Sequence, residues 1–156
     1  MTLKRIDHVN IVVTNLERSK AFYGAILGLK VVFEAELSGP WISRVTGVED
    51  VKAQYVILEP PEGGCRIELI EYEKPEGITS NSISEVNATG LRHLAFQVEN
   101  IDEVVDRLTA KGVKFNSDPV AVSSAVASAP KAKGKKLCYF RDPDGVILEI
   151  AEYTGN

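Results

Sequence analysis

Two histidines and two glutamates are the residues of this chain whose types and positions could do metal chemistry. His8 and His93 are the only histidines among 156 residues, and Glu68 and Glu149 each stand between apolar neighbours. Burying a carboxylate in such a stretch is costly unless a cation compensates its charge. Two neutral imidazoles and two carboxylates neutralise one divalent metal ion, and this mixed ligand set suits Zn, Ni, Co, Mn or Fe(II). Positions left open on such an ion can chelate two adjacent oxygens of a small-molecule substrate.

The four residues fall on equivalent positions of an internal repeat. Residues 8–16 align without a gap with residues 93–101, and residues 67–72 align with residues 148–153. The offset falls from 85 to 81 along the chain, which indicates small length changes in the loops of a duplicated unit. An isolated strand histidine is usually just hydrogen-bonded in a core or rim. The equivalent placement of both pairs therefore favours a shared ligand role.

The repeat predicts two modules, about 1–74 and 90–156, joined by a linker over 75–89. Each module has the order strand, helix and three strands, so we expect an α+β fold of two tandem βαβββ modules within a single domain, 1–156. Such a module forms a curved sheet with its helix on one face, and two modules can form a cleft between their sheets. The expected strands are 4–13, 30–37, 53–59 and 65–72, then 91–98, 113–116, a strand near 119–126, 136–141 and 146–153; the expected helices are 16–27 and 101–111.

Local signals mark the ends of the expected helices and the last hairpin. Thr14 and Asn100 each precede a glutamate by three residues, which is the spacing of a capping box. Gly28 and Gly112 stand where a left-handed cap would end each helix. The sequence Asp-Pro-Asp-Gly at 142–145 predicts a tight turn, because proline presets φ and glycine accepts a positive φ.

Alternation along the strands places the four candidate ligands on one kind of face. In the first strand His8 shares a face with Asn10, opposite Val9 and Ile11. Each of the four strands thus has an apolar face, which we expect under its helix, and a more polar face, which we expect to line the cleft. Asn10 is therefore a candidate substrate-binding residue. The alternation puts Cys65 on the face opposite Glu68, where we expect it to pack.

Composition excludes several classes of function. Lys and Arg total 18 against 22 Asp and Glu, and the net charge of −4 gives no electrostatic footprint for nucleic acid or an anionic membrane. No apolar run approaches the roughly 18 residues that a membrane span needs. The first residues lack a signal-peptide core, so we expect a cytoplasmic protein. Two cysteines cannot make a disulfide scaffold.

Two loops contain further candidates. In the expected loop 38–50, Trp41 and Arg44 could form a substrate wall, an aromatic face beside a guanidinium that pairs with carboxylate. The alternative is that Trp41 plugs an end of the core. Residues 121–136, which contain four lysines, are either a solvated loop or a lid with a basic rim for an anionic substrate.

These motifs together resemble the vicinal oxygen chelate superfamily, which contains glyoxalase I, methylmalonyl-CoA epimerase, extradiol dioxygenases, fosfomycin-resistance enzymes and bleomycin-binding proteins. The resemblance implies paired βαβββ modules, a metal ion on His8, Glu68, His93 and Glu149, and a homodimer. The motifs are most similar to those of glyoxalase I and the epimerase. They are Asp7-His8-Val9, Ala21-Phe22-Tyr23, Leu27-Gly28-Leu29, Ile67-Glu68-Leu69, Arg92-His93-Leu94-Ala95-Phe96, and Tyr139 to Gly145 leading to Leu148-Glu149.

The resemblance implies isomerase or lyase chemistry, in which a proton moves next to a carbonyl through a metal-stabilised enediolate on a small oxygenated acid or thioester. Glu149 is then the first candidate for ligand and base, with Glu68 second. Val12 stands where glyoxalase I usually carries an arginine for glutathione, which favours the epimerase-like reading. Two alternatives stay open: an extradiol-type dioxygenase, with Tyr139 or Tyr153 as proton donor, and a non-catalytic antibiotic-binding protein.

Overall fold

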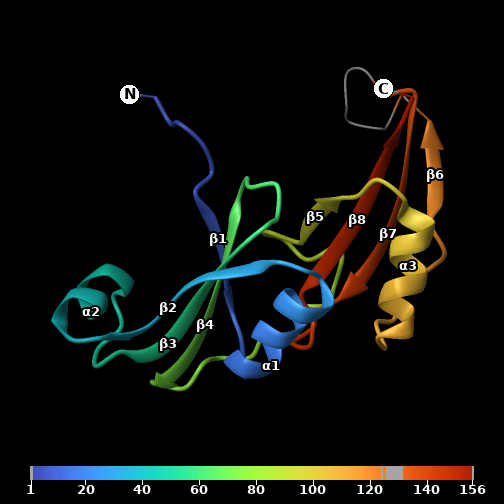
Figure 1. Cartoon of the computed structure of the whole chain (residues 1–156). Coiled ribbons are helices and arrows are strands. Elements are labelled where there is room, and N and C mark those ends of the chain that lie inside the picture. Colours follow the sequence, from blue (N-terminus) through green and yellow to red (C-terminus); the bar gives the residue numbers. More distant parts are fainter. Residues whose placement is uncertain (1, 124, 126–131, 156) are drawn as a thin grey trace. The chain divides into compact units, whose positions relative to one another are not determined.

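The computed structural model describes residues 2–123, 125 and 132–155, and it divides after Thr79 into two units, Met1–Thr79 and Ser80–Asn156. Each unit contains one four-stranded mixed sheet and has the order strand, helix, three strands, with an additional helix between the second and third strands of the first unit (Figure 1). This confirms the predicted α+β fold of two tandem βαβββ modules. Among the described residues, no helix is both long enough and apolar enough to cross a membrane.

The first unit has the strand order β1-β4-β3-β2. β1 runs parallel to β4, and the other neighbours are antiparallel. Its elements are β1 (His8–Val12), α1 (Leu16–Ala21), a π-helical turn η1 (Phe22–Ile26), β2 (Lys30–Ser38), α2 (Pro40–Thr46), β3 (Lys52–Glu59) and β4 (Arg66–Lys74).

The second unit repeats this topology with the order β5-β8-β7-β6. β5 is parallel to β8, as β1 is to β4. Its elements are β5 (His93–Gln97), α3 (Ile101–Ala110), β6 (Val120–Ser123), β7 (Gly134–Arg141) and β8 (Ile147–Thr154). Figure 1 shows α3 beside this sheet, and α3 contacts β8.

Several predicted boundaries are corrected by the structure. β1 starts at His8 because its partner β4 begins at Arg66, so residues 4–7 do not form the strand that we expected there. The helix expected over 16–27 changes to π-type hydrogen bonding at Phe22, whose carbonyl accepts from the Leu27 N–H at 3.0 Å. The strand expected over 113–116 is a single bridge from Phe115 to Phe140.

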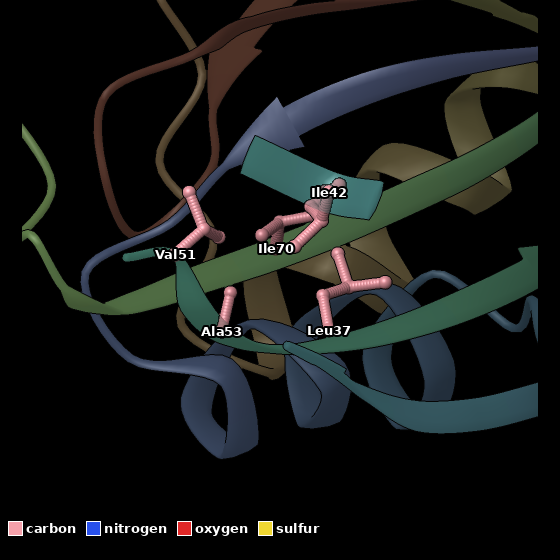
Figure 2. Packing of buried hydrophobic residues seen from close by; sticks show 5 residues of the cluster. All are labelled: Leu37, Ile42, Val51, Ala53 and Ile70. Atoms are coloured by element: carbon pink, nitrogen blue, oxygen red, sulfur yellow. The ribbon is translucent and has the colours of Figure 1, made fainter. Parts of the chain in front are cut away.

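The expected loop 38–50 contains a helix, α2, which sequence analysis missed. Pro40 occupies the first turn, where its lack of an N–H costs nothing, and Gly47 ends the helix at φ +71°. Ile42 of α2 packs in a cluster with Leu37, Val51, Ala53 and Ile70 (Figure 2). The buried side chain that anchors this helix is therefore Ile42 rather than its neighbour Trp41, which is 56% exposed.

Helix starts are equivalent in the two units. Asn15 and Asn100 cap α1 and α3, each accepting a hydrogen bond from a backbone N–H three residues on. The prediction was right for Asn100 and off by one residue for Thr14. In both units a glutamate of the last strand also accepts from the first helical N–H: Glu71 from Leu16 at 2.6 Å and Glu152 from Ile101 at 3.2 Å. A carboxylate at this position satisfies an orphan donor and complements the helix dipole.

The sheet face that carries Glu68 is more apolar than predicted. Glu68 and Ile70 share a face of β4, and their neighbours on β3 are Ile57 and Tyr55. The α2 cluster covers the part of this same face around Ile70. Glu71 lies on the opposite face with α1, because it alternates with Ile70. The candidate ligand thus stands at the edge of an apolar surface.

Candidate metal centre

The first unit brings His8 and Glu68 together. They lie on neighbouring parallel strands, β1 and β4, and the His8 Nε2 atom is 3.8 Å from Glu68 Oε1. Asn10, the residue paired with Glu68 across the sheet, donates from Nδ2 to the same carboxylate oxygen at 3.0 Å. The Glu68 side chain is 18% exposed, so it can meet a ligand from outside the sheet. Asn10 is therefore a direct neighbour of Glu68, and its substrate-binding role stays a prediction.

Asp7 orients the imidazole of His8. Its Oδ2 atom lies 2.9 Å from His8 Nδ1, and the same carboxylate accepts from Arg66. The hydrogen bond from His8, together with the one from Arg66, holds the pKa of the Asp7 carboxyl below its usual range. A proton on Nδ1 leaves Nε2 with its lone pair directed away from Asp7. This carboxylate–histidine arrangement is the usual second-sphere support of a metal-binding histidine.

The second unit brings His93 and Glu149 together in the same way. They lie on the parallel strands β5 and β8, with His93 Nε2 at 3.4 Å from Glu149 Oε2. The Glu149 side chain is 4% exposed. The ammonium group of Lys135 donates to the other oxygen of Glu149, with Nζ 2.5 Å from Oε1. The first unit has no lysine at the equivalent place.

We call the His8–Glu68 pair the first half-site and the His93–Glu149 pair the second half-site. Tyr139 is a further neighbour of the second half-site. It lies opposite Glu149 in the β7–β8 pairing, and its ring centroid is 5.3 Å from that of His93. Burial, followed by the negative charge of Glu149, raises the pKa of the Tyr139 hydroxyl above its usual value. The phenol therefore keeps its proton at neutral pH and can serve as a hydrogen-bond donor.

The donor pairs of both units fit a divalent cation. Two atoms that bind one ion in neighbouring positions at about 2.1 Å lie roughly 3.0–3.4 Å apart. The nitrogen–oxygen separations of 3.4 and 3.8 Å are close to this value. Each unit contributes one imidazole and one carboxylate. Across the described part of the chain, no group of three or more His, Cys, Asp or Glu residues forms a metal cluster, so the four-ligand centre stays a prediction.

The remaining predicted site residues lie on α2 of the first unit. Trp41 and Arg44 are both exposed on α2, and neither forms a hydrogen bond or ion pair with His8 or Glu68 among the described residues. The alternative that Trp41 plugs the core is wrong. Cys65 is exposed rather than packed, because β4 begins only at the next residue.

Lys135 and Tyr139 are the site neighbours whose roles sequence analysis missed or left open. Lys135 was placed in the loop 121–136, but β7 begins at Gly134 and brings it into the sheet. Counting back from the turn at 142–145 with a period of two would have placed both side chains on the face of Glu149. The part of that loop over 126–131, with Lys131, lies outside the described residues.

The repeated topology and the paired half-sites define a class of proteins built from two duplicated βαβββ modules. A family model described as Glyoxalase/Bleomycin resistance protein/Dioxygenase superfamily matches residues 5–150. The chain belongs to this superfamily. The match confirms the resemblance carried by the sequence motifs.

Three individual proteins show how far the similarity extends. The YaeR protein of Escherichia coli strain K12 is 33% identical over 96% of this chain and 97% of its own length. A crystal structure of a glyoxalase family protein from Bacillus cereus is 32% identical, with a TM-score of 0.82 and coverage of 99% of this chain and 97% of that one. The mitochondrial methylmalonyl-CoA epimerase of Homo sapiens is 27% identical over 96% of this chain and 74% of its own length.

Proposed function

We propose that this protein is a divalent-metal-dependent isomerase or lyase that moves a proton at a carbon next to a carbonyl group. The substrate is a small oxygenated acid or thioester, and His8, Glu68, His93 and Glu149 hold the ion together. The observation that carries the proposal is the repeated imidazole–carboxylate pair, at 3.8 Å in one unit and 3.4 Å in the other. The similarity to an epimerase supports the reaction class.

The chain itself supplies the group that moves the proton. When bound, the ion supplies Lewis acidity to the carbonyl oxygen of the substrate. A carboxylate then takes the proton from the neighbouring carbon and returns it. Glu149 and Glu68 are the two candidates, and the sequence motifs favour Glu149.

The contacts of the two carboxylates favour Glu68 as the one that moves. Glu149 is nearly fully buried and is held at 2.5 Å by Lys135. Glu68 is more exposed and is held by the neutral amide of Asn10 at 3.0 Å. An amide hydrogen bond is weaker than a hydrogen bond between two charged groups. Glu68 can therefore leave its resting position at a smaller free-energy cost, while Glu149 stays in place as a ligand.

The apolar surface beside Glu68 gives the carbon chain of the substrate a place to lie. Ile57 is the neighbour of Glu68 on β3, and Phe33 is the neighbour of Ile57 on β2. Phe33 is 52% exposed and its ring packs against that of Tyr55 at 5.7 Å. Covering this surface with the apolar part of a substrate removes it from water, which contributes to binding. The proposal thus places the polar, reacting end at Glu68 and the apolar body along Ile57 and Phe33.

Metal analysis combined with proton exchange tests the proposal. The purified protein is stripped with a chelator and reloaded with Mn, Co, Ni or Zn, and the bound metal is quantified. A panel of 2-oxo acids, branched acyl thioesters and hemithioacetals is then incubated with the loaded protein in D2O. We expect about one ion per chain, and metal-dependent deuterium incorporation next to the carbonyl of at least one compound. A protein that takes up no divalent ion contradicts the proposal, as does one that binds an ion but exchanges no proton in any class.

A ring-cleaving dioxygenase is the second candidate, and Tyr139 is the observation that favours it. The ring centroids of Tyr139 and His93 are 5.3 Å apart. The raised pKa of the Tyr139 phenol means that it keeps its proton at neutral pH. A dioxygenase needs such a proton donor beside its iron ligands. Oxygen uptake by the Fe(II)-loaded protein with a panel of catechols distinguishes the two reactions. Under the main proposal we expect no uptake above that of the metal in buffer.

A further inference from the structure

The two half-sites share their ligands but differ in one charged neighbour. Lys135 pairs with Tyr153 across β7 and β8, and the equivalent pair in the first unit is Ala53 with Tyr72. Ala53 is fully buried under α2 and carries no charge. In the first unit Glu68 therefore lies beside an apolar surface, whereas in the second unit Glu149 is paired with the ammonium group of Lys135.

Lys135 is fixed at the second half-site by three features. Its side chain is only 13% exposed, its Nζ atom lies 2.5 Å from Glu149 Oε1, and the same Nζ lies 5.6 Å from the ring centroid of Tyr153. The next residue, Lys136, lies on the opposite face of β7 and pairs with Asp102 at 2.7 Å. Burial removes water from the ammonium group of Lys135, which is unfavourable. The negative charge of Glu149 compensates this cost.

Arg141 adds a second cation to the same sheet face. It lies six residues from Lys135 on β7, so the two side chains project to the same side. Its guanidinium donates to Asn116 Oδ1 at 2.6 Å and to the backbone carbonyl of Ser84 at 3.0 Å, and both acceptors are neutral. These hydrogen bonds orient Arg141 without cancelling its charge.

We propose that Lys135 makes the metal centre selective for a substrate with a carboxylate group next to the reacting carbonyl. The inference rests on the proposed function. One divalent ion would cancel the charges of Glu68 and Glu149, so Lys135 adds a positive charge to the centre that neither carboxylate then compensates. Lys135 lies against Oε1 of Glu149, while the Oε2 atom of the same carboxylate faces His93. A 2-oxo carboxylate compensates the excess charge, and a neutral dicarbonyl compound of the same shape does not.

Two probes of equal shape and different charge test this inference. The full-length protein is loaded with Co(II), and the binding of 2-oxobutyrate and of neutral 2,3-pentanedione is measured by calorimetry and by the visible spectrum of the ion. We compare wild type with Lys135→Met, which removes the charge, and with Lys135→Arg, which keeps it. Lys136→Met is the matched control, because it removes a lysine from the other face of the same strand.

We expect wild type to bind 2-oxobutyrate at least about tenfold more tightly than the diketone, since a unit charge acts over a few ångströms in a poorly solvated site. Lys135→Met should lose about tenfold in affinity for 2-oxobutyrate and none for the diketone, and it should bind Co(II) more tightly because a like charge is gone. Lys135→Arg and Lys136→Met should keep the wild-type preference. An unchanged preference in Lys135→Met overturns the inference and leaves the proposed function standing. A wild-type protein that binds no Co(II) overturns both.

Discussion

The two half-sites show which parts of a duplicated module stayed the same and which diverged. His8 and His93, and likewise Glu68 and Glu149, occupy equivalent strands with similar separations. Their surroundings differ, because Asn10 holds Glu68 through an amide, whereas Lys135 holds Glu149 through an ammonium group. Equivalent ligands with different neighbours allow one carboxylate to move and the other to remain fixed. Under the proposed function, the metal centre would therefore have one carboxylate that moves and one that stays fixed as a ligand.

The largest expected effect is the loss of the ion when one ligand is removed. His8→Ala deletes an imidazole, and Glu149→Gln deletes a negative charge, so both should weaken metal binding by at least about 100-fold and abolish turnover. Titration calorimetry of the metal-free proteins measures the affinity, and proton exchange measures turnover. Glu99→Gln, which changes an exposed glutamate outside both half-sites, is the matched control. Full turnover in either ligand variant would contradict the proposal that all four residues bind one catalytic ion.

The next effect compares the two carboxylates in the absence of any metal. Glu149→Gln leaves the nearly buried ammonium of Lys135 without its counter-charge, which should lower the free energy of unfolding by about 2 kcal/mol. Glu68→Gln changes only the acceptor of the hydrogen bond from the neutral amide of Asn10, at a more exposed position. It should lower the free energy of unfolding by about 0.5 kcal/mol or less. Urea unfolding of the chelator-treated proteins measures both values. Equal losses would show that Lys135 does not distinguish the half-sites.

A smaller and equal effect is expected where the two units did not diverge. Glu71 and Glu152 accept from the first N–H groups of α1 and α3, at 2.6 and 3.2 Å. Glu71→Ala and Glu152→Ala should each lower the free energy of unfolding by about 1 kcal/mol, because each leaves the first N–H group of its helix without its acceptor. Urea unfolding with and without bound metal checks this. A loss that appears only with the metal bound would mean that these glutamates serve the site rather than the helices.

The topology could be predicted from the sequence because the same pattern of strands and helix occurs in both repeats. Strand alternation placed His8 and Glu68 on one face, and the equivalent offset placed His93 and Glu149 in the same way. The asparagine cap at Asn100 and the turn ending at Gly145 followed from local backbone chemistry, and both are confirmed. These signals are local or periodic, so they do not depend on tertiary packing.

The features that were missed depend on tertiary contacts that one module has and the other lacks. α2 is stabilised by Ile42 packing on Leu37, Ala53 and Ile70, and the short segment has no helical periodicity long enough to predict it. Lys135 contacts Glu149 only because β7 starts earlier than composition indicated. A repeat predicts what two modules share, and the neighbours that separate Glu149 from Glu68 are by definition what they do not share.

The smallest effect concerns a buried thiol that has no influence at neutral pH. Cys138 of β7 lies opposite Ile150 on the face turned away from Glu149, and burial raises its pKa to about 11. A folded-state pKa above the unfolded value means that the contribution of this group to stability is complete below pH 9 and is lost as the pH rises towards 11. A thiol reagent at pH 8 should therefore label exposed Cys65 in the native protein and both cysteines in urea. Cys138→Val should remove the alkaline loss and leave metal affinity unchanged. Rapid labelling of Cys138 in the native protein would show that the helix side of the second sheet opens, which would contradict the burial that raises the pKa of this thiol.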